Sequence, residues 1–262
     1  MSRRYSTRTI PIPMTISSAE FRRRQKRYYA KRRDKTVPES LERFLEKRIA
    51  VLDRILGSAE TIVEVCCGRG YLLERLSSSR KGRCVLGFDI SEERCREAKE
   101  RGGTVFLGDV TCIPLSDEVA DLVFGNEFLH HVHHSERRKC LLELMRIVKP
   151  GGTVIMIEPN RFHPLMILAG ILLEADRGVF DFSLPETVDA LREAGAEQIS
   201  VAPFNCFTYP SRKPVPNCMR KYFYVIEDLL EKPVLAASRI ITARKAVSRP
   251  RYTGSRKEEK EG

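Results

Sequence analysis

An acidic residue and two glycines stand close together early in the chain, in an arrangement that can hold a small molecule. Glu64 lies within an apolar run, and Gly68 and Gly70 follow it four and six positions later. Glycine has no side chain, so a turn built from it brings the backbone close to a ligand. A second acid, Asp89, ends the next apolar run. A carboxylate offers paired acceptors, which suits the two adjacent hydroxyls of a ribose.

These residues require strands and helices that bring them to one place. Residues 62–65 read as a buried strand, and residues 71–76, just after the glycine turn, have helical spacing. A strand, a glycine turn and a helix place the site at the carboxyl end of the first strand of an open α/β sheet. Further strands are predicted over 84–88, 104–110, 121–126, 153–157, 197–202 and 237–243, and further helices over 39–56, 135–148 and 185–194.

Two classes of cofactor use such a turn. A dinucleotide site requires the pattern G-x-G-x-x-G, whose last glycine lets the helix pack closely on the strand. In this chain Gly68 and Gly70 are followed by Tyr71, Leu72 and Leu73, so the third glycine is missing. A dehydrogenase is therefore the least favoured interpretation.

The motifs instead resemble those of the class I (Rossmann-like) S-adenosylmethionine-dependent methyltransferases. Residues 64–70 resemble the family motif E/D-x-G-x-G-x-G, with Cys66 at the first glycine position. Residues 108–114 form a G-D-x-x-x-I-P phrase that resembles the family's adenine-contacting motif. The resemblance runs in order from residue 62 to about 160. It implies a doubly wound, seven-stranded, mostly parallel sheet with an antiparallel last strand and helices on both faces.

The resemblance also implies roles for individual residues. Glu64 would contact the ammonium end of the cofactor's methionine. Asp89 would take the ribose hydroxyls and Ile90 would pack on the adenine. Asp109 would accept from the adenine amino group and the Val110 amide would meet the ring. The implied cofactor-binding residues are Glu64, Cys66, Gly68, Gly70, Asp89, Ile90, Asp109, Val110 and Asn126.

Asn126 and the histidines after it would lie next to the transferred methyl group. Asn126 does not open the Asn/Asp-Pro-Pro-Tyr/Phe motif of methyltransferases that act on the amino groups of bases or glutamine. His130 and His131 are the candidate catalytic residues, because a neutral imidazole can take a proton from a substrate near pH 7. A histidine that merely supports the cofactor loop is the alternative. No metal site is expected.

Charge is concentrated at the two ends of the chain. Residues 1–36 hold 12 Lys or Arg against 2 acids, a net charge of +10, and residues 239–262 have a net charge of +5. We expect a basic N-terminal arm over 1–36, a methyltransferase domain over 37–245 and a basic, charged tail over 246–262. Basic ends can contact nucleic acid or an anionic membrane. A solvated arm, or a helix covering the cofactor with Tyr28 and Tyr29, is the favoured interpretation of the N-terminal charge.

Within the domain we expect a cofactor core over about 60–160 and two substrate-side inserts, at about 161–182 and 209–230. The apolar run over 165–173 in the first insert is far too short to span a membrane. It predicts a buried helix, with a substrate-pocket wall or a membrane-surface contact as alternatives.

The 8 cysteines show no C-x-x-C pair and no zinc-type spacing, and no signal peptide is visible. We therefore expect a cytoplasmic protein with reduced thiols. The preferred function is transfer of a methyl group from S-adenosylmethionine to a small or medium-sized acceptor. The alternatives are an RNA or protein methyltransferase that uses the basic ends, and a non-catalytic S-adenosylmethionine-binding module.

Overall fold

The computed structural model describes residues 17–31, 38–79, 82–204, 225 and 236–247. The insert predicted at about 209–230 lies outside these residues except for residue 225, and so does most of the basic sequence at the two ends. Among the described residues, no helix combines the length and the apolar character needed to cross a membrane.

Seven strands form one sheet in the order β3-β2-β1-β4-β5-β7-β6. The strands are β1 Thr61–Val65, β2 Cys84–Asp89, β3 Thr104–Leu107, β4 Ala120–Asn126, β5 Val148–Pro159, β6 Ala196–Phe204 and β7 Ser238–Lys245. The first five strands pair in parallel, and β7 runs antiparallel to both of its neighbours. The predicted fold class is confirmed. The strand order reverses between β1 and β4, and in such sheets ligands bind outside the carboxyl ends of the strands at this switch point.

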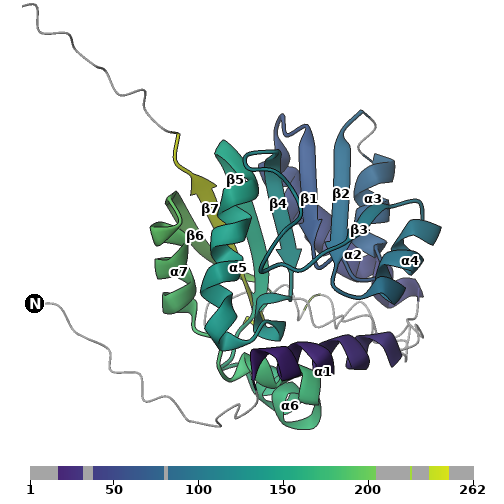
Figure 1. Ribbon diagram of the computed structural model, residues 1–262, viewed down its shortest axis with the longest axis vertical. Coiled ribbons are helices and arrows are strands. Elements are labelled where there is room, and N and C mark those ends of the chain that lie inside the picture. The colour runs from purple at the N-terminus through teal and green to yellow at the C-terminus, as the bar shows by residue number, and fades with distance from the viewer. Residues whose placement is uncertain (1–16, 32–37, 80–81, 205–224, 226–235, 248–262) are drawn as a thin grey trace, which may run out of the picture.

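Helices cover both faces of the sheet (Figure 1). They are α1 Ser18–Lys31, α2 Pro38–Leu56, α3 Tyr71–Ser79, α4 Glu92–Glu100, α5 His134–Ile147, α6 Pro164–Leu172 and α7 Leu184–Glu193, with short 3-10 helices η1 Leu129–His131 and η2 Glu174–Val179. The helices α5 and α7 pack on one face, and α2, α3 and α4 pack on the other.

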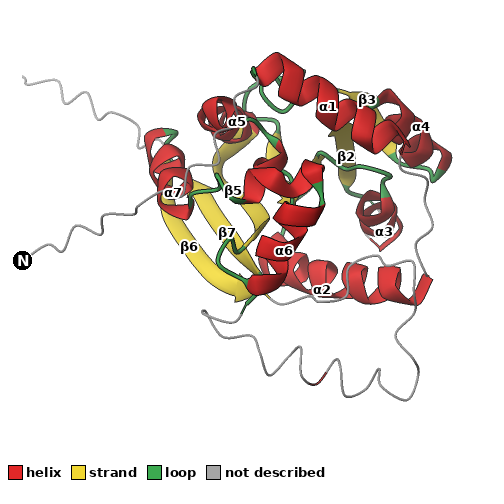
Figure 2. Ribbon diagram, turned by 90° about the horizontal axis from the view of Figure 1, so that it is seen from below, coloured by secondary structure: helices red, strands yellow, loops and turns green. Residues whose placement is uncertain are grey.

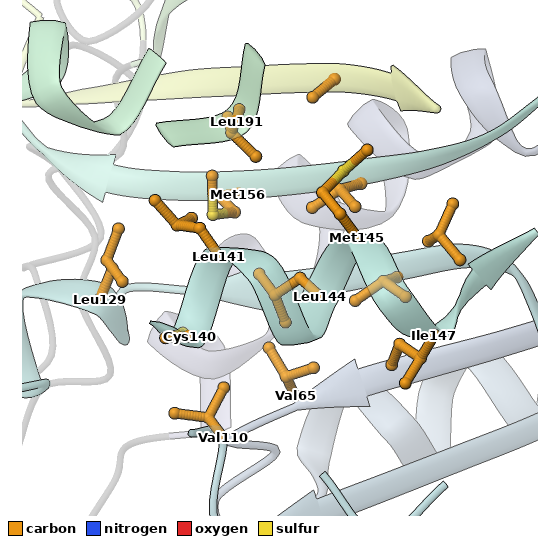
Figure 3. Close-up of a cluster of buried hydrophobic side chains, with 14 of the residues drawn as sticks. Val65, Val110, Leu129, Cys140, Leu141, Leu144, Met145, Ile147, Met156 and Leu191 are labelled. Carbon is orange, nitrogen blue, oxygen red and sulfur yellow. The ribbon is translucent and has the colours of Figure 1, made fainter. Parts of the chain in front are cut away.

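Strand residues alternate between the two cores because successive side chains of a strand point to opposite faces. Ile62 joins the core under α2 and α3, whereas Val63 and Val65 join the core under α5. Figure 3 shows the second core, where Leu141 and Met145 lie near Met156 and Leu191. These buried apolar contacts fix the sheet beneath the site.

The third strand is shorter than predicted, and the fifth is longer. The prediction extended the third strand to residue 110, but β3 ends at Leu107. The Asp109 carboxylate accepts hydrogen bonds from the amide and the hydroxyl of Thr111, and such local bonds favour a turn over a strand. The strand predicted over 153–157 begins earlier, at Val148, and β5 includes Gly151, which has a φ of +76°.

The apolar run of the first insert forms α6, but the prediction that this helix is buried was wrong. Ile171 and Leu172 are 61% and 69% exposed. Met166 and Ala169, on the same helix, line a cavity at the carboxyl edge of the sheet. The alternative of a pocket wall therefore describes one side of α6, and the other side is open.

The glycine turn after β1 depends on close packing as well as on backbone conformation. Gly70 has a φ of +76°, and a Cβ atom there would lie 2.6 Å from the Cβ of Ala98 in α4. Gly102, with a φ of +85°, has nothing within 4 Å of the corresponding position. The two glycines thus share a left-handed conformation, but only a side chain at Gly70 would clash with a neighbouring residue.

We expect Gly70→Ala to lower the free energy of unfolding by roughly 2–4 kcal/mol, because strain and a steric clash combine. Gly102→Ala, which adds strain alone, should cost about 1 kcal/mol. Urea unfolding followed by circular dichroism measures both. Equal losses would show that the contact with Ala98 does not matter.

Candidate cofactor and catalytic site

A cavity of about 610 Å³ lies at the carboxyl edge of the sheet, bounded by α1, α6 and η2. It gathers all but one of the residues singled out in the sequence. These are Glu64, Cys66, Gly68, Asp89, Ile90, Asp109, Val110, Asn126, His130 and His131. Gly70 does not line it, and contributes through the turn instead.

Asp89 connects the ends of two neighbouring strands. Its carboxylate accepts hydrogen bonds from the amide of Gly68, at 2.9 Å, and from the amide of Ser91, at 2.9 Å. Ser91 in turn caps the N-terminus of α4. Burial raises the pKa of the Asp89 carboxyl, and the hydrogen bonds from Ser91 and Gly68 oppose that shift. The carboxylate therefore holds the glycine turn against the end of β2.

Glu64 is buried in β1, with one oxygen left without a partner. The residue is 5% exposed, and its Oε2 atom makes no hydrogen bond. Burial, and then the nearby charge of Asp89, raise the pKa of Glu64 to about 8. A buried carboxylate oxygen with no partner costs free energy that a cationic ligand group would recover.

The two cysteines of the turn have different positions. Cys66 has a φ of +53°, the left-handed conformation that glycine adopts easily, and it lines the cavity. Cys67 also lines the cavity, and it packs in the core beside Leu73 and Gly87. Burial raises the pKa of both thiols, so both stay protonated and unreactive at neutral pH. Every cysteine within the described residues is a free thiol.

The helix α1 covers the cavity and is anchored by Arg22. The Arg22 guanidinium lies 2.7 Å from the Asp109 carboxylate and 2.6 Å from that of Glu136. Phe21 of the same helix is buried. Sequence analysis did not identify Arg22, because nothing in a run of basic residues distinguishes one from another. Asp109 thus anchors the cover as well as lining the cavity.

Arg48 of α2 was also missed. It is 1% exposed, donates from Nε to the side-chain oxygen of Asn126, and lies 3.3 Å from a Glu127 carboxylate oxygen. Its guanidinium stacks on the ring of Phe44, 3.4 Å from the centroid. The available signal was its place on the apolar stripe of α2, four residues after Phe44 and four before Leu52. Arg48 fixes the orientation of Asn126.

His130 is held by Glu158 at the end of β5. The Glu158 carboxylate lies 3.0 Å from His130 Nδ1 and accepts hydrogen bonds from the amides of Phe128 and Leu129. Burial raises the pKa of Glu158 to about 7 and lowers that of His130 to about 3. His130 is therefore neutral at physiological pH and positions the loop after β4. Glu158 was another functional residue that the sequence analysis did not assign.

His131 lies in a more open and more polar environment. Its Nε2 atom is 2.7 Å from the Tyr29 hydroxyl of α1 and 3.8 Å from the Asp176 carboxylate of η2. His130, His131 and Asp176 each offer one atom that could bind a metal, all within 4.8 Å of one another. The absence of a metal stays a prediction, which elemental analysis of the purified protein can check.

Comparisons with known proteins agree with the fold. Residues 63–156 match a family described as a methyltransferase domain. A tRNA (carboxymethyluridine(34)-5-O)-methyltransferase from Arabidopsis thaliana is 30% identical over 50% of this chain and 32% of its own length. A ubiquinone biosynthesis O-methyltransferase from Nitrosomonas europaea is 32% identical over 48% of this chain and 55% of its own. The chain thus spans about a third to a half of these relatives.

The structural comparison covers more of the chain. A possible histamine N-methyltransferase from Thermotoga maritima superimposes with a TM-score of 0.59 and 22% identity, covering 87% of this chain and 99% of that one. This similarity shows the fold. Residues 63–156 are thus similar to a methyltransferase-domain family, and the sheet order and the structural match show the fold that this similarity implies.

Proposed function

We propose that this protein transfers a methyl group from S-adenosylmethionine to a small or medium-sized acceptor. The observation that carries the proposal is the buried, unpartnered carboxylate oxygen of Glu64, which shares one cavity with Asp89 and Asp109. Three acids at neighbouring strand ends suit a ligand that carries an ammonium group, a ribose and an adenine.

The residues of the cavity fit this cofactor. Glu64 would take the ammonium group, and Asp89 the ribose hydroxyls, since a carboxylate that already accepts two backbone hydrogen bonds keeps further lone pairs. Asp109 would accept from the adenine amino group, a role that it would share with anchoring Arg22. Gly68 leaves its backbone accessible beside the methionine end. When bound, S-adenosylmethionine supplies an electrophilic methyl group on a sulfonium.

The protein contributes mainly position and exclusion of water. Aligning two bound reactants can remove up to ~7–11 kcal/mol of the barrier. The helix α1 covers the cavity, and Arg48 and Asn126 form a fixed part of its wall. These features can hold an acceptor atom in line with the methyl group.

Between the two candidate bases, His131 is better suited to accept a proton from the acceptor. The depressed pKa of His130 makes it a weak base, and its contact with Glu158 gives it a positioning role. His131 contacts Tyr29 and lies near Asp176, whose negative charge would stabilise an imidazolium.

The proposal of a small acceptor rests on the covered cavity. One relative is named as acting on tRNA and another as acting in ubiquinone biosynthesis, so both kinds of acceptor occur among similar proteins. An RNA or protein methyltransferase would show salt-sensitive binding of its polymer. A non-catalytic module would bind the cofactor without transferring its methyl group. A cytoplasmic location remains a prediction.

Calorimetry with S-adenosylmethionine and with its demethylated product tests the proposal. We expect both to bind, and Asp89→Ala to weaken binding roughly 10–100-fold, because charged hydrogen bonds contribute about 1.5–3 kcal/mol. Asp121→Ala is the matched control. Asp121 also accepts two backbone hydrogen bonds, from Glu60 and Thr61, but at the opposite edge of the sheet. Failure of either ligand to bind the wild-type protein would refute the proposal.

Glu64→Gln should stabilise the ligand-free protein and weaken its cofactor binding. The raised pKa means that wild-type stability is fully present below the unfolded pKa near 4.5 and is lost as pH rises towards 8. The glutamine side chain of the variant cannot ionise, so its burial carries no such loss. We expect the free energy of unfolding of Glu64→Gln to exceed that of the wild type by roughly 1–3 kcal/mol at pH 8. Urea unfolding across this pH range measures the difference.

Glu143→Gln is the control in which we expect the opposite change in stability. Arg146 lowers the pKa of the Glu143 carboxyl, so removing that charge should reduce stability above the unfolded pKa. If Glu64→Gln also destabilised the protein at pH 8, the assignment of Glu64 as a carboxylate awaiting a cation would fail.

His131→Ala should lower methyl transfer by roughly 10²–10⁴-fold while leaving cofactor affinity unchanged, as expected for loss of a general base. Incorporation of labelled methyl into fractionated cell extract provides the assay, and calorimetry provides the affinity. His134→Ala, at an exposed position outside the cavity, should leave both unchanged. An unaltered transfer rate in His131→Ala would exclude this histidine as the proton acceptor.

A further inference from the structure

The helix α6 carries a concentrated patch of exposed apolar side chains. Its nine residues, PLMILAGIL, include no charged or polar side chain. Six of the ten large hydrophobic residues that are exposed in the described chain lie on or beside it. We call these the apolar patch: Phe162, Ile167, Leu168, Ile171, Leu172 and Leu173. Single exposed apolar residues are ordinary on soluble proteins, whereas a contiguous group marks an interaction surface.

The position of α6 shows that the patch lies at the mouth of the cavity. Met166 and Ala169 of this helix line the cavity, as does Leu173 directly after it, and Gly170 packs against the ring of Phe180. Leu173 belongs to both surfaces, since it lines the cavity and is 41% exposed. Leu173 therefore connects the apolar patch to the wall of the cavity.

A basic surface lies next to the patch. The helix α1 turns Phe21 and Tyr29 towards the cavity, and Arg23, Lys26 and Arg27 are exposed. The helices α1 and α6 both contact η2, and Figure 2 shows both at the carboxyl edge of the sheet, with α1 along one side and α6 nearer the centre.

We propose that this edge of the protein docks on an anionic lipid bilayer. The apolar patch enters the interfacial region of the bilayer, while the cations of α1 lie against the acidic headgroups. A short apolar helix beside basic residues has this chemistry, because its binding combines burial of apolar area with electrostatic attraction to anionic lipids. A helix of nine residues is far too short to span the membrane and would lie at its surface.

Sedimentation of the full chain with lipid vesicles tests the proposal without requiring cofactor or activity. We expect binding to vesicles of phosphatidylcholine mixed with phosphatidylglycerol, weaker binding to phosphatidylcholine alone, and release as sodium chloride is raised. Leu172→Glu should reduce binding roughly tenfold, because it removes an apolar contact and adds a charge of the wrong sign. Arg23→Ala and Arg27→Ala should each reduce it roughly fivefold.

Val247→Glu is the matched control. Val247 is 61% exposed, close to the 69% of Leu172, but it lies beside Gly151 at the opposite edge of the sheet. The control should bind vesicles as the wild type does, and calorimetry should show that Leu172→Glu binds S-adenosylmethionine normally. The cofactor measurement and the vesicle measurement can therefore fail independently.

Four results would overturn the proposal. Equal binding to both kinds of vesicle would remove the role of the α1 cations and of anionic lipid. Equal loss in Leu172→Glu and Val247→Glu would remove the role of the patch. Concentration-dependent dimerisation that Leu172→Glu abolishes, without vesicle binding, would make α6 an interface between copies of the chain. Salt-sensitive RNA binding without vesicle binding would assign the basic surface of α1 to nucleic acid.

Discussion

The Asp89 carboxylate joins two strand ends that are far apart in the sequence. It accepts an amide hydrogen bond from the turn after β1 and another from the start of α4. A backbone bond from the Cys67 amide to the Phe88 carbonyl runs alongside, and Gly70 packs directly on α4. The position of the turn, and hence the floor of the cavity, depends on these contacts. The charge that makes them is buried, so its hydrogen bonds must offset its desolvation.

The buried carboxylates of Glu64 and Glu158 have different roles, although both lie on strands of the same sheet. Burial raises the pKa of both Glu64 and Glu158. Glu158 is surrounded by donors, namely two backbone amides and His130, and it fixes the loop after β4. Glu64 keeps one oxygen without a partner and faces the cavity. The difference between a structural acid and one ready for a ligand thus arises from the number of donors that the fold supplies.

Polar contacts attach the cover of the cavity, together with the buried ring of Phe21. Arg22 joins α1 to Asp109 and Glu136, and Tyr29 joins it to His131. Ion pairs at a partly exposed rim are weak compared with buried apolar packing. The parts of the molecule therefore differ in how firmly they are held, with a sheet fixed by two apolar cores and a cover fixed by side chains that also line the site.

The sequence by itself determined the sheet and the acids at its carboxyl edge. Alternating apolar residues, glycines and acids are local signals, and strand period and turn chemistry translate them directly into strand ends. It could not reveal that Arg22, Arg48 and Asp176 converge on the same cavity, or that Glu158 holds His130 beside it, because these residues lie far apart in the sequence and carry no local pattern. Only the tertiary structure decided that α6 is open on one side. An apolar run has the same spacing whether it packs in a core, lines a pocket or lies at the outer surface. Which of these occurs depends on how the whole chain packs around it.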